Sequence, residues 1–109
     1  MQNQGMRTET DVYNRVKWDQ DLDEKEFYIG FLSLDPVEMV EIVEEVRFAS
    51  FNREVVPMHR IRYFKFHDIE VWNREEKIDN FFGSMTRTQR KQKVTRRTIH
   101  DIIAEYHSL

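Results

Sequence analysis

Apolar positions near the N-terminus repeat with helical spacing. Thr10 is a suitable N-cap residue, and Val12 and Val16 fall on one face of the helix that would follow it. The acidic run of residues 19–23 is typical of a turn. The sequence therefore predicts a short helix that begins after Thr10 and ends near Trp18.

Beyond this run the pattern becomes that of extended chain. Residues 27–33 are rich in aromatic and β-branched side chains and predict a strand. Residues 54–66 predict a second strand with Pro57 at an edge or bulge. Residues 37–46 fit a helical stripe and a strand equally well, and their periodicity does not decide between the two.

A hairpin is predicted next. His67 and Asp68 can form its two-residue turn, although neither is a glycine, and residues 69–74 would form the returning strand. Residues 75–82 then predict a short helix that ends at Gly83.

The C-terminus predicts one more amphipathic helix. Thr98 and Asp101 have the spacing of a capping box. Four apolar residues follow with helical spacing and would form the buried stripe, namely Ile99, Ile102, Ile103 and Tyr106. So short a helix needs tertiary contacts, so this stripe should dock on the body, on a second copy or on a partner.

Together these elements predict the α+β class, a small antiparallel sheet with a short N-terminal helix packed on it through Val12 and Val16 and a C-terminal helix. We expect a domain over residues 10–84, a basic linker over 85–97 and the amphipathic helix over 98–109. Residues 1–83 have a net charge of −7, whereas residues 84–109 have a net charge of +4. An acidic body of this kind would have to bind RNA through a local site.

Composition narrows the class of protein further. A chain of 109 residues has room for one domain with a modest core. It contains no cysteine, which excludes disulfides, thiolate nucleophiles and cysteine-based zinc sites. No apolar run approaches membrane-spanning length and the first ten residues are polar, so we expect neither a membrane span nor a signal peptide. The expected location is cytoplasmic or nuclear.

The hairpin also predicts a binding surface. With His67 and Asp68 as the turn, Tyr63 would face Trp72 on one side of the sheet, beside Lys65 and Arg74. Aromatic rings next to cations are typical of surfaces that hold an unpaired base and its phosphate. The alternative is that both rings pack beneath the N-terminal helix, with Lys65 and Glu70 a plain cross-strand pair.

Four blocks of sequence carry a resemblance to a known family. They are DVYNRVKWD (11–19), VPMHRIRYF (56–64), VWNR (71–74) and IDNFFGS (78–84). In this order and spacing they resemble the RNA cyclic-group-end recognition domain family. The resemblance implies a compact α+β module that recognises RNA ends bearing a 2′,3′-cyclic phosphate or a related 3′-end group. It also implies an RNA-processing or end-repair enzyme as a partner, and no cofactor.

The blocks and the hairpin together define the predicted RNA- and phosphate-binding residues. A cyclic phosphodiester is a monoanion, so one arginine fork and one further donor would be adequate. We expect Arg15, His59, Arg60, Arg62, Trp72 and Arg74 to converge on one concave patch. The full set is Asn14, Arg15, Trp18, His59, Arg60, Arg62, Tyr63, Lys65, Trp72 and Arg74.

Two other classes of function stay open. His59, His67 and Lys65 could cleave a phosphodiester by acid–base catalysis. The sequence has no motif that gives each of them a role, so we expect a non-enzyme without a catalytic or metal site. The other alternative is a protein-interaction module that acts through the C-terminal helix.

Overall fold

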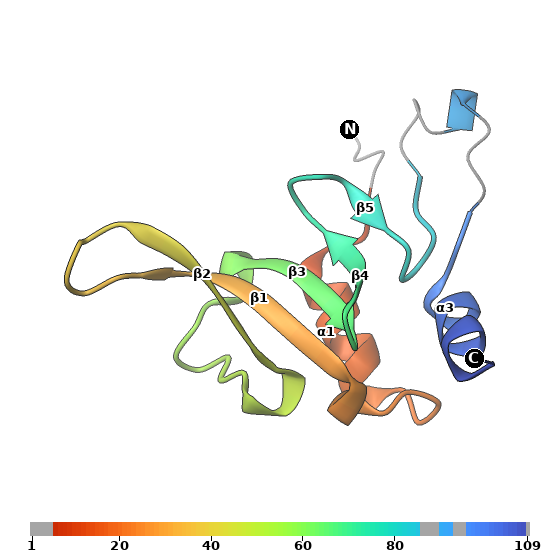
Figure 1. Ribbon diagram of the computed structural model, residues 1–109, viewed down its shortest axis with the longest axis horizontal. Coiled ribbons are helices and arrows are strands. Elements are labelled where there is room, and N and C mark those ends of the chain that lie inside the picture. The colour runs from red at the N-terminus through yellow and green to blue at the C-terminus, as the bar shows by residue number, and fades with distance from the viewer. Residues whose placement is uncertain (1–5, 86–89, 93–95, 109) are drawn as a thin grey trace.

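The computed structural model of the protein is an α+β domain built on an antiparallel sheet, as predicted (Figure 1). The structure describes residues 6–85, 90–92 and 96–108. Its sheet has five strands in the order β2-β1-β3-β4-β5. The elements are α1 (Glu9–Trp18), η1 (Glu24–Glu26), β1 (Phe27–Leu34), β2 (Glu41–Arg47), η2 (Phe48–Ser50), η3 (Met58–Arg60), β3 (Ile61–Phe66), β4 (Ile69–Asn73), β5 (Ile78–Asp79) and α3 (Ile99–His107), where η denotes a short 3₁₀ turn.

Helix α1 begins two residues earlier than Thr10 predicted. Its N-cap is Thr8, whose hydroxyl accepts the Asp11 N–H while the Asp11 carboxylate accepts the Thr8 N–H. This reciprocal pair needs an acid or amide three residues after the cap, which Thr8 has and Thr10 lacks. The predicted end at Trp18 is confirmed, and so is the packing of Val12 and Val16, which are 0% and 1% exposed.

The segment whose periodicity was ambiguous is a strand. Glu41–Arg47 pairs with β1 along its whole length, from Tyr28 opposite Arg47 to Leu34 opposite Glu41. The strand predicted over residues 54–66 is half wrong, because only Ile61–Phe66 is extended. Asn52 holds the earlier part in a turn, since its side chain accepts the Glu54 N–H and its carbonyl accepts two further N–H groups.

The hairpin of β3 and β4 forms with the predicted turn. His67 adopts a positive φ of 56° in place of a glycine, and its N–H donates to the Glu26 carbonyl at 2.8 Å. The predicted register is correct beside the turn, where Lys65 lies opposite Glu70. Then the register shifts at a bulge, so the structure pairs Phe64 with Trp72. The predicted Tyr63–Trp72 pair is therefore wrong.

The helix predicted over residues 75–82 is absent, and this stretch forms turns and strand β5 instead. Asp79 is 4% exposed and accepts the backbone N–H groups of Phe81, Phe82 and Ser84. A side chain that captures these donors offers the backbone an alternative to helical hydrogen bonds. Gly83 ends the turn at a positive φ of 82°.

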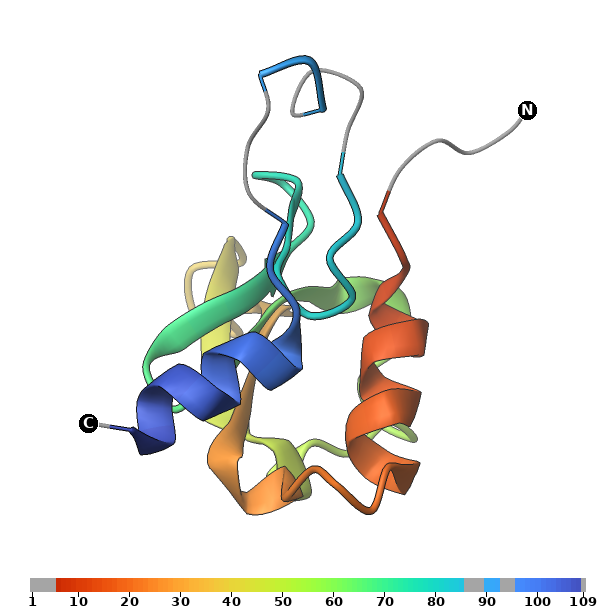
Figure 2. The same cartoon turned by 90° about the vertical axis from the view of Figure 1, so that its right-hand side faces the viewer.

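Helix α3 forms with the predicted cap, in which the N–H and the hydroxyl of Thr98 both donate to the Asp101 carboxylate. The predicted stripe is confirmed, because Ile99 and Ile102 are buried and Ile103 and Tyr106 pack against the same core. Tyr106 meets Phe66 edge to face at 5.3 Å, so the helix lies across the end of the sheet (Figure 2). Most of the predicted basic linker, at residues 86–89 and 93–95, lies outside the described residues.

The two faces of the sheet differ. One face carries Phe27, Ile29, Phe64 and Phe66, all fully buried in the core that α1 covers. On the other face, Tyr63 lies opposite Gly30, and a Cβ added to Gly30 would come within 2.1 Å of the tyrosine ring. Glycine at this position is therefore required by the close approach of the ring.

Because the Tyr63 hydroxyl is anchored on Glu45, its ring has little freedom to move away. We therefore expect Gly30→Ala to destabilise the domain by about 1–3 kcal/mol, the usual cost of overpacking. In a Tyr63→Ala background the same substitution should cost less than about 0.5 kcal/mol, because the clash is removed. Urea unfolding of the four proteins gives this double-mutant cycle. Equal costs in both backgrounds would contradict the predicted contact.

Candidate nucleic-acid interface

The exposed side of α1 has an unusual composition for an acidic chain. Its four exposed residues are Asn14, Arg15, Lys17 and Trp18. The acids of the helix are used elsewhere, because Asp11 caps the helix and Glu9 forms an ion pair with Arg74. The helix therefore presents two cations, an amide and an indole to solvent.

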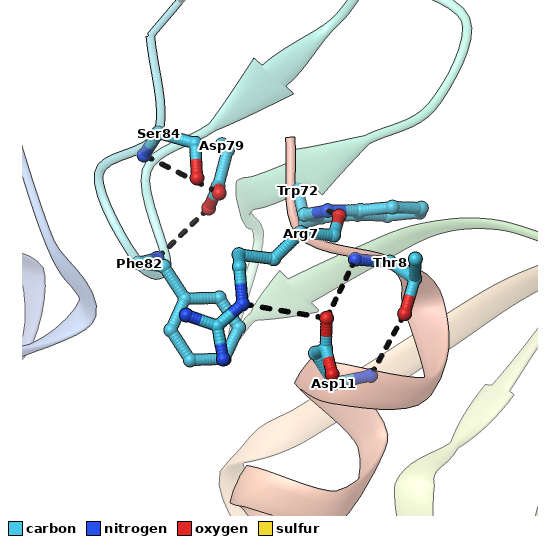
Figure 3. Close-up of polar contacts among 7 residues, drawn as sticks. All are labelled: Arg7, Thr8, Asp11, Trp72, Asp79, Phe82 and Ser84. Carbon is cyan, nitrogen blue, oxygen red and sulfur yellow. Dashed lines mark hydrogen bonds and ion pairs between the residues drawn. The ribbon is translucent and has the colours of Figure 1, made fainter. Parts of the chain in front are cut away.

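Two guanidinium groups, one from the residue before the N-cap of α1 and one from its last turn, meet one aromatic ring. Arg7 lies 4.4 Å and Arg15 lies 5.2 Å from the centroid of Phe82. Figure 3 shows Arg7 beside this ring while its Nε donates to Asp11 at 3.3 Å. The turn closed by Asp79 presents Phe82 to the helix in the same view. Arg7 is thus also paired with the Asp11 carboxylate, whereas the cation–π contact of Arg15 keeps a positive charge near the surface.

At the C-terminal end of α1 the surface is hollowed into a pocket of about 480 Å³. Trp18 borders this pocket and is 74% exposed, which is exceptional for the largest apolar side chain. Lys17 and Arg53 bring positive charge to the lining. The complete lining is Tyr13, Lys17, Trp18, Ala49, Ser50, Phe51, Asn52, Arg53 and Glu54.

The walls of this pocket are fixed by the core beneath it. Tyr13 is 5% exposed and stacks on Phe48 with ring centroids 4.7 Å apart. The Arg53 guanidinium lies 5.2 Å from the Tyr13 ring. Because the Asn52 side-chain oxygen already accepts the Glu54 N–H, the amide NH₂ remains to donate to a ligand. The pocket thus combines a stacking surface with donors and cations.

Two of the predicted residues lie on the opposite face of the sheet from α1. Tyr63 donates to the Glu45 carboxylate at 2.7 Å, and Lys65 meets the same oxygen at 3.0 Å. The hydrogen bond from Tyr63, aided by Lys65, lowers the pKa of Glu45. Burial and the Glu45 carboxylate raise the pKa of Tyr63. This cluster is internally neutralised and offers little free charge to a phosphate.

Three predicted arginines are held by the protein itself. Arg60 forms an ion pair with Glu41 at 3.2 Å. The Arg62 guanidinium donates to the carbonyls of His59 and Ile61 and lies near Glu75. Arg74 is bound by Glu9. Their first role in this structure is to join β3, β4 and α1 to neighbouring segments.

The last two predicted residues differ in exposure. The turn η3, which contains His59, packs beside α1, and the His59 side chain is exposed. Trp72 is 1% exposed, because the bulge directs its ring into the core, where Nε1 donates to the Arg7 carbonyl at 3.0 Å (Figure 3). An indole so enclosed does not present a face to a base, which corrects the expectation of an exposed Tyr63–Trp72 pair.

The structure thus brings Asn14, Arg15 and Trp18 together on one helix and separates them from Tyr63 and Lys65. Sequence reasoning missed Lys17 and Arg53. Lys17 stands in the block DVYNRVKWD and could have been recognised from it. Arg53 lies between the recognised blocks, and only the packing of its loop against α1 places it at the pocket.

An exposed indole beside two cations on one helix is a combination that can stack on a base and meet its phosphate, and it is compatible with a nucleic-acid-binding module. The comparison with known families agrees with this class. The family model of the MJ1316 RNA cyclic group end recognition domain matches residues 6–74, and the chain belongs to this family. Recognition of RNA ends is thus its function at the level of the family. No solved structure matches the chain.

The matched residues contain all of α1 and the whole lining of the pocket. They also contain Arg7, whereas Phe82 lies beyond them. Among the described residues, no helix has the length and apolar character needed to cross a membrane.

The cap that starts α1 makes a prediction about stability. Asp11→Ala should cost about 1 kcal/mol at neutral pH, the typical value of a lost capping interaction. Burial alone would raise the pKa of Asp11, but hydrogen bonds from Thr8 and Arg7 lower it below 3.8. The contribution is therefore complete above that pH and is lost as the pH falls through the pKa of the folded state.

Urea unfolding at neutral and strongly acidic pH checks this prediction, since the difference from the unsubstituted protein should shrink in acid. Thr10→Ala is the matched control and should change stability by less than about 0.5 kcal/mol. A larger loss for Thr10→Ala than for Asp11→Ala would place the cap at Thr10 instead.

Proposed function

We propose that this chain is an RNA-binding accessory module that recognises 3′ ends carrying a 2′,3′-cyclic phosphate or a related group through the exposed side of α1. The observation that carries the proposal is the pocket beside Trp18, which lies wholly within the residues matched by the family. Its volume of about 480 Å³ falls within the range of small-ligand sites and suits a terminal nucleotide.

Trp18 supplies the stacking surface. An indole that is 74% exposed gains by covering its face with a base, and every base has a face that it can cover. Stacking of this kind fixes the position of a terminal base without selecting its identity. The domain would then bind ends of many sequences, as a module that reads the chemistry of the end must do.

Lys17, Arg53 and the Asn52 amide supply the phosphate contacts. A cyclic phosphate has a single negative charge and no hydroxyl donor, so it needs only hydrogen-bond donors and one or two cations. An open 3′-phosphate carries up to two negative charges, so the Glu54 carboxylate in the lining would repel it more strongly than the monoanionic cyclic group. The contrast between these donors and Glu54 offers a means to distinguish the ends.

The rest of the α1 surface suits the RNA backbone that precedes the end. The ten residues of α1 span about 15 Å, the length of roughly four stacked nucleotides. Arg15 and Arg7 lie along this path with their charges beside Phe82. Arg15 meets Asp19 only at 3.9 Å, so much of its charge stays available to a phosphate.

Both alternative functions find less support. The apolar stripe of α3 is buried against its own sheet, so a partner could take the stripe only by displacing the helix. Of the candidate acid–base residues, His67 is bound to Glu26 at 2.9 Å and stacks on Tyr106, and Lys65 is paired with Glu45. The family description is one of recognition, which favours binding over catalysis.

The proposed function is tested by titrating one single-stranded oligonucleotide with three ends, namely 2′,3′-cyclic phosphate, 3′-phosphate and 3′-hydroxyl. We expect the tightest binding for the cyclic end. Trp18→Ala should weaken binding of all three about tenfold, because stacking contributes about 1–3 kcal/mol whatever the end group. Arg53→Ala should instead reduce the preference for the cyclic end over the 3′-hydroxyl end, because only the phosphate-bearing end gains from a charged donor.

Lys65→Ala is the matched control, since it removes one cation from the opposite face of the sheet and should leave all three affinities unchanged. Arg7→Ala and Arg15→Ala should each lower the slope of log affinity against log salt by about 0.7. Thermal unfolding confirms that each variant is folded. If Arg62→Ala lowers affinity while Trp18→Ala and Arg53→Ala do not, the site lies at η3 and β3 and the α1 proposal fails.

A further inference from the structure

The β1–β2 hairpin is the part of the surface that neither the core nor the proposed RNA site explains. It projects away from the body of the domain, on the side far from α3 (Figure 1). Six of the eight large exposed hydrophobic side chains in the described part of the chain lie between residues 34 and 43. They are Leu34, Val37, Met39, Val40, Ile42 and Val43, with Val37 86% and Met39 66% exposed.

The tip of this hairpin is well ordered by hydrogen bonds. Asp35 accepts the Val37 N–H on its side chain at 2.8 Å and the Met39 N–H on its carbonyl at 2.8 Å. Its own N–H donates to Val40 at 2.8 Å. Met39 takes a positive φ of 58°, which is uncommon for a side chain of this kind. The apolar groups are thus displayed on a defined scaffold.

No strand among the described residues pairs with the outer edge of β2, because β2 pairs with β1 alone. Folded proteins usually protect such edges with lysine, proline, a bulge or a covering element. Strand β2 contains neither lysine nor proline, and its pairing with β1 runs over seven residues without a register shift. This edge is therefore a good template for an added strand.

The charge of the edge selects the occupant. Of the three glutamates of strand β2, Glu41 already pairs with Arg60 and Glu45 with Lys65. The negative charge that the described part of the edge offers a partner therefore comes from Glu44 and from the exposed Glu38 at the tip. A second copy of β2 would bring like charges together, because antiparallel pairing centred on Glu44 places that residue against its counterpart. RNA would be repelled by the same carboxylates. A strand with alternating basic and apolar residues would match both the charges and the exposed valines.

We propose that the free edge of β2 is a docking site for a basic, apolar strand of another protein, which would extend the sheet by β-augmentation. The main-chain groups of the edge would supply affinity, and Glu44 would select a lysine or arginine side chain opposite it. The apolar tip would pack against the surface from which that strand comes. The site is separate from the α1 surface, so both can be occupied at once.

A defined peptide tests this inference. The probe is a capped peptide of the same length as β2 in which lysine and valine alternate, added to the full chain at up to millimolar concentration. We expect the peptide to change the backbone amide chemical shifts of the full chain mainly at Glu41–Arg47. It should also slow the hydrogen exchange of the amide protons on the outer edge of β2. A matched peptide of alternating glutamate and valine should give no such change. Equal responses to both peptides, or none to either, would overturn the proposal.

Two substitutions sharpen the test. Glu44→Lys should weaken binding of the basic peptide about fivefold or more, because a cross-strand charge pair becomes a repulsion. Val43→Lys should abolish binding, whereas Val55→Lys, which alters another exposed valine outside the hairpin, should leave it unchanged. If light scattering instead shows a concentration-dependent dimer that Glu44→Lys abolishes, the occupant is a second copy and the proposal is wrong.

Discussion

The bulge between β3 and β4 anchors the start of α1 to the sheet and hence fixes which side of the helix the domain exposes. The register shift beyond Lys65 turns Trp72 toward the core, where its ring meets Phe64 edge to face. Its indole N–H then binds the carbonyl of Arg7, the residue that immediately precedes the N-cap Thr8. A helix anchored at its first turn and packed through Val12 and Val16 has one orientation, so its outer side is also fixed.

The distribution of charge follows from this placement. Acidic side chains near α1 and β3 are bound by the protein itself, as with Glu9 on Arg74 and Glu45 on Tyr63 and Lys65. Five acidic residues, Asp35, Glu38, Glu41, Glu44 and Glu45, belong to the β1–β2 hairpin, which projects away from α1 (Figure 1). The outer side of α1 is left with cations and an indole although the chain as a whole is acidic. A local surface of this kind can attract a phosphate at short range, where contacts matter more than net charge.

Local features of the fold were predictable where their cause lies within a few residues. The Thr98–Asp101 cap, the His67-Asp68 turn and the stripes of α1 and α3 depend on spacings of three to four residues or on adjacent positions. Two of the errors are local as well, but they come from side-chain hydrogen bonds and not from the spacing of apolar residues. Asn52 and Asp79 each capture backbone N–H groups with a side chain, and this competes with the strand or helix that periodicity favours. The pattern of apolar residues around Asn52 and Asp79 does not reveal these hydrogen bonds.

The sequence by itself determined the α+β class, both terminal helices, the hairpin and the family blocks that point to RNA ends. Only the tertiary structure decided which side chains meet. A bulge of a single residue moves every later side chain to the other face of a strand, and this buried Trp72 when the unshifted register exposed it. The grouping of Trp18 with Arg53 depends in the same way on a loop that packs against Tyr13. Contacts between distant segments depend on strand register and on how loops pack. The spacing of residues along the chain predicts neither.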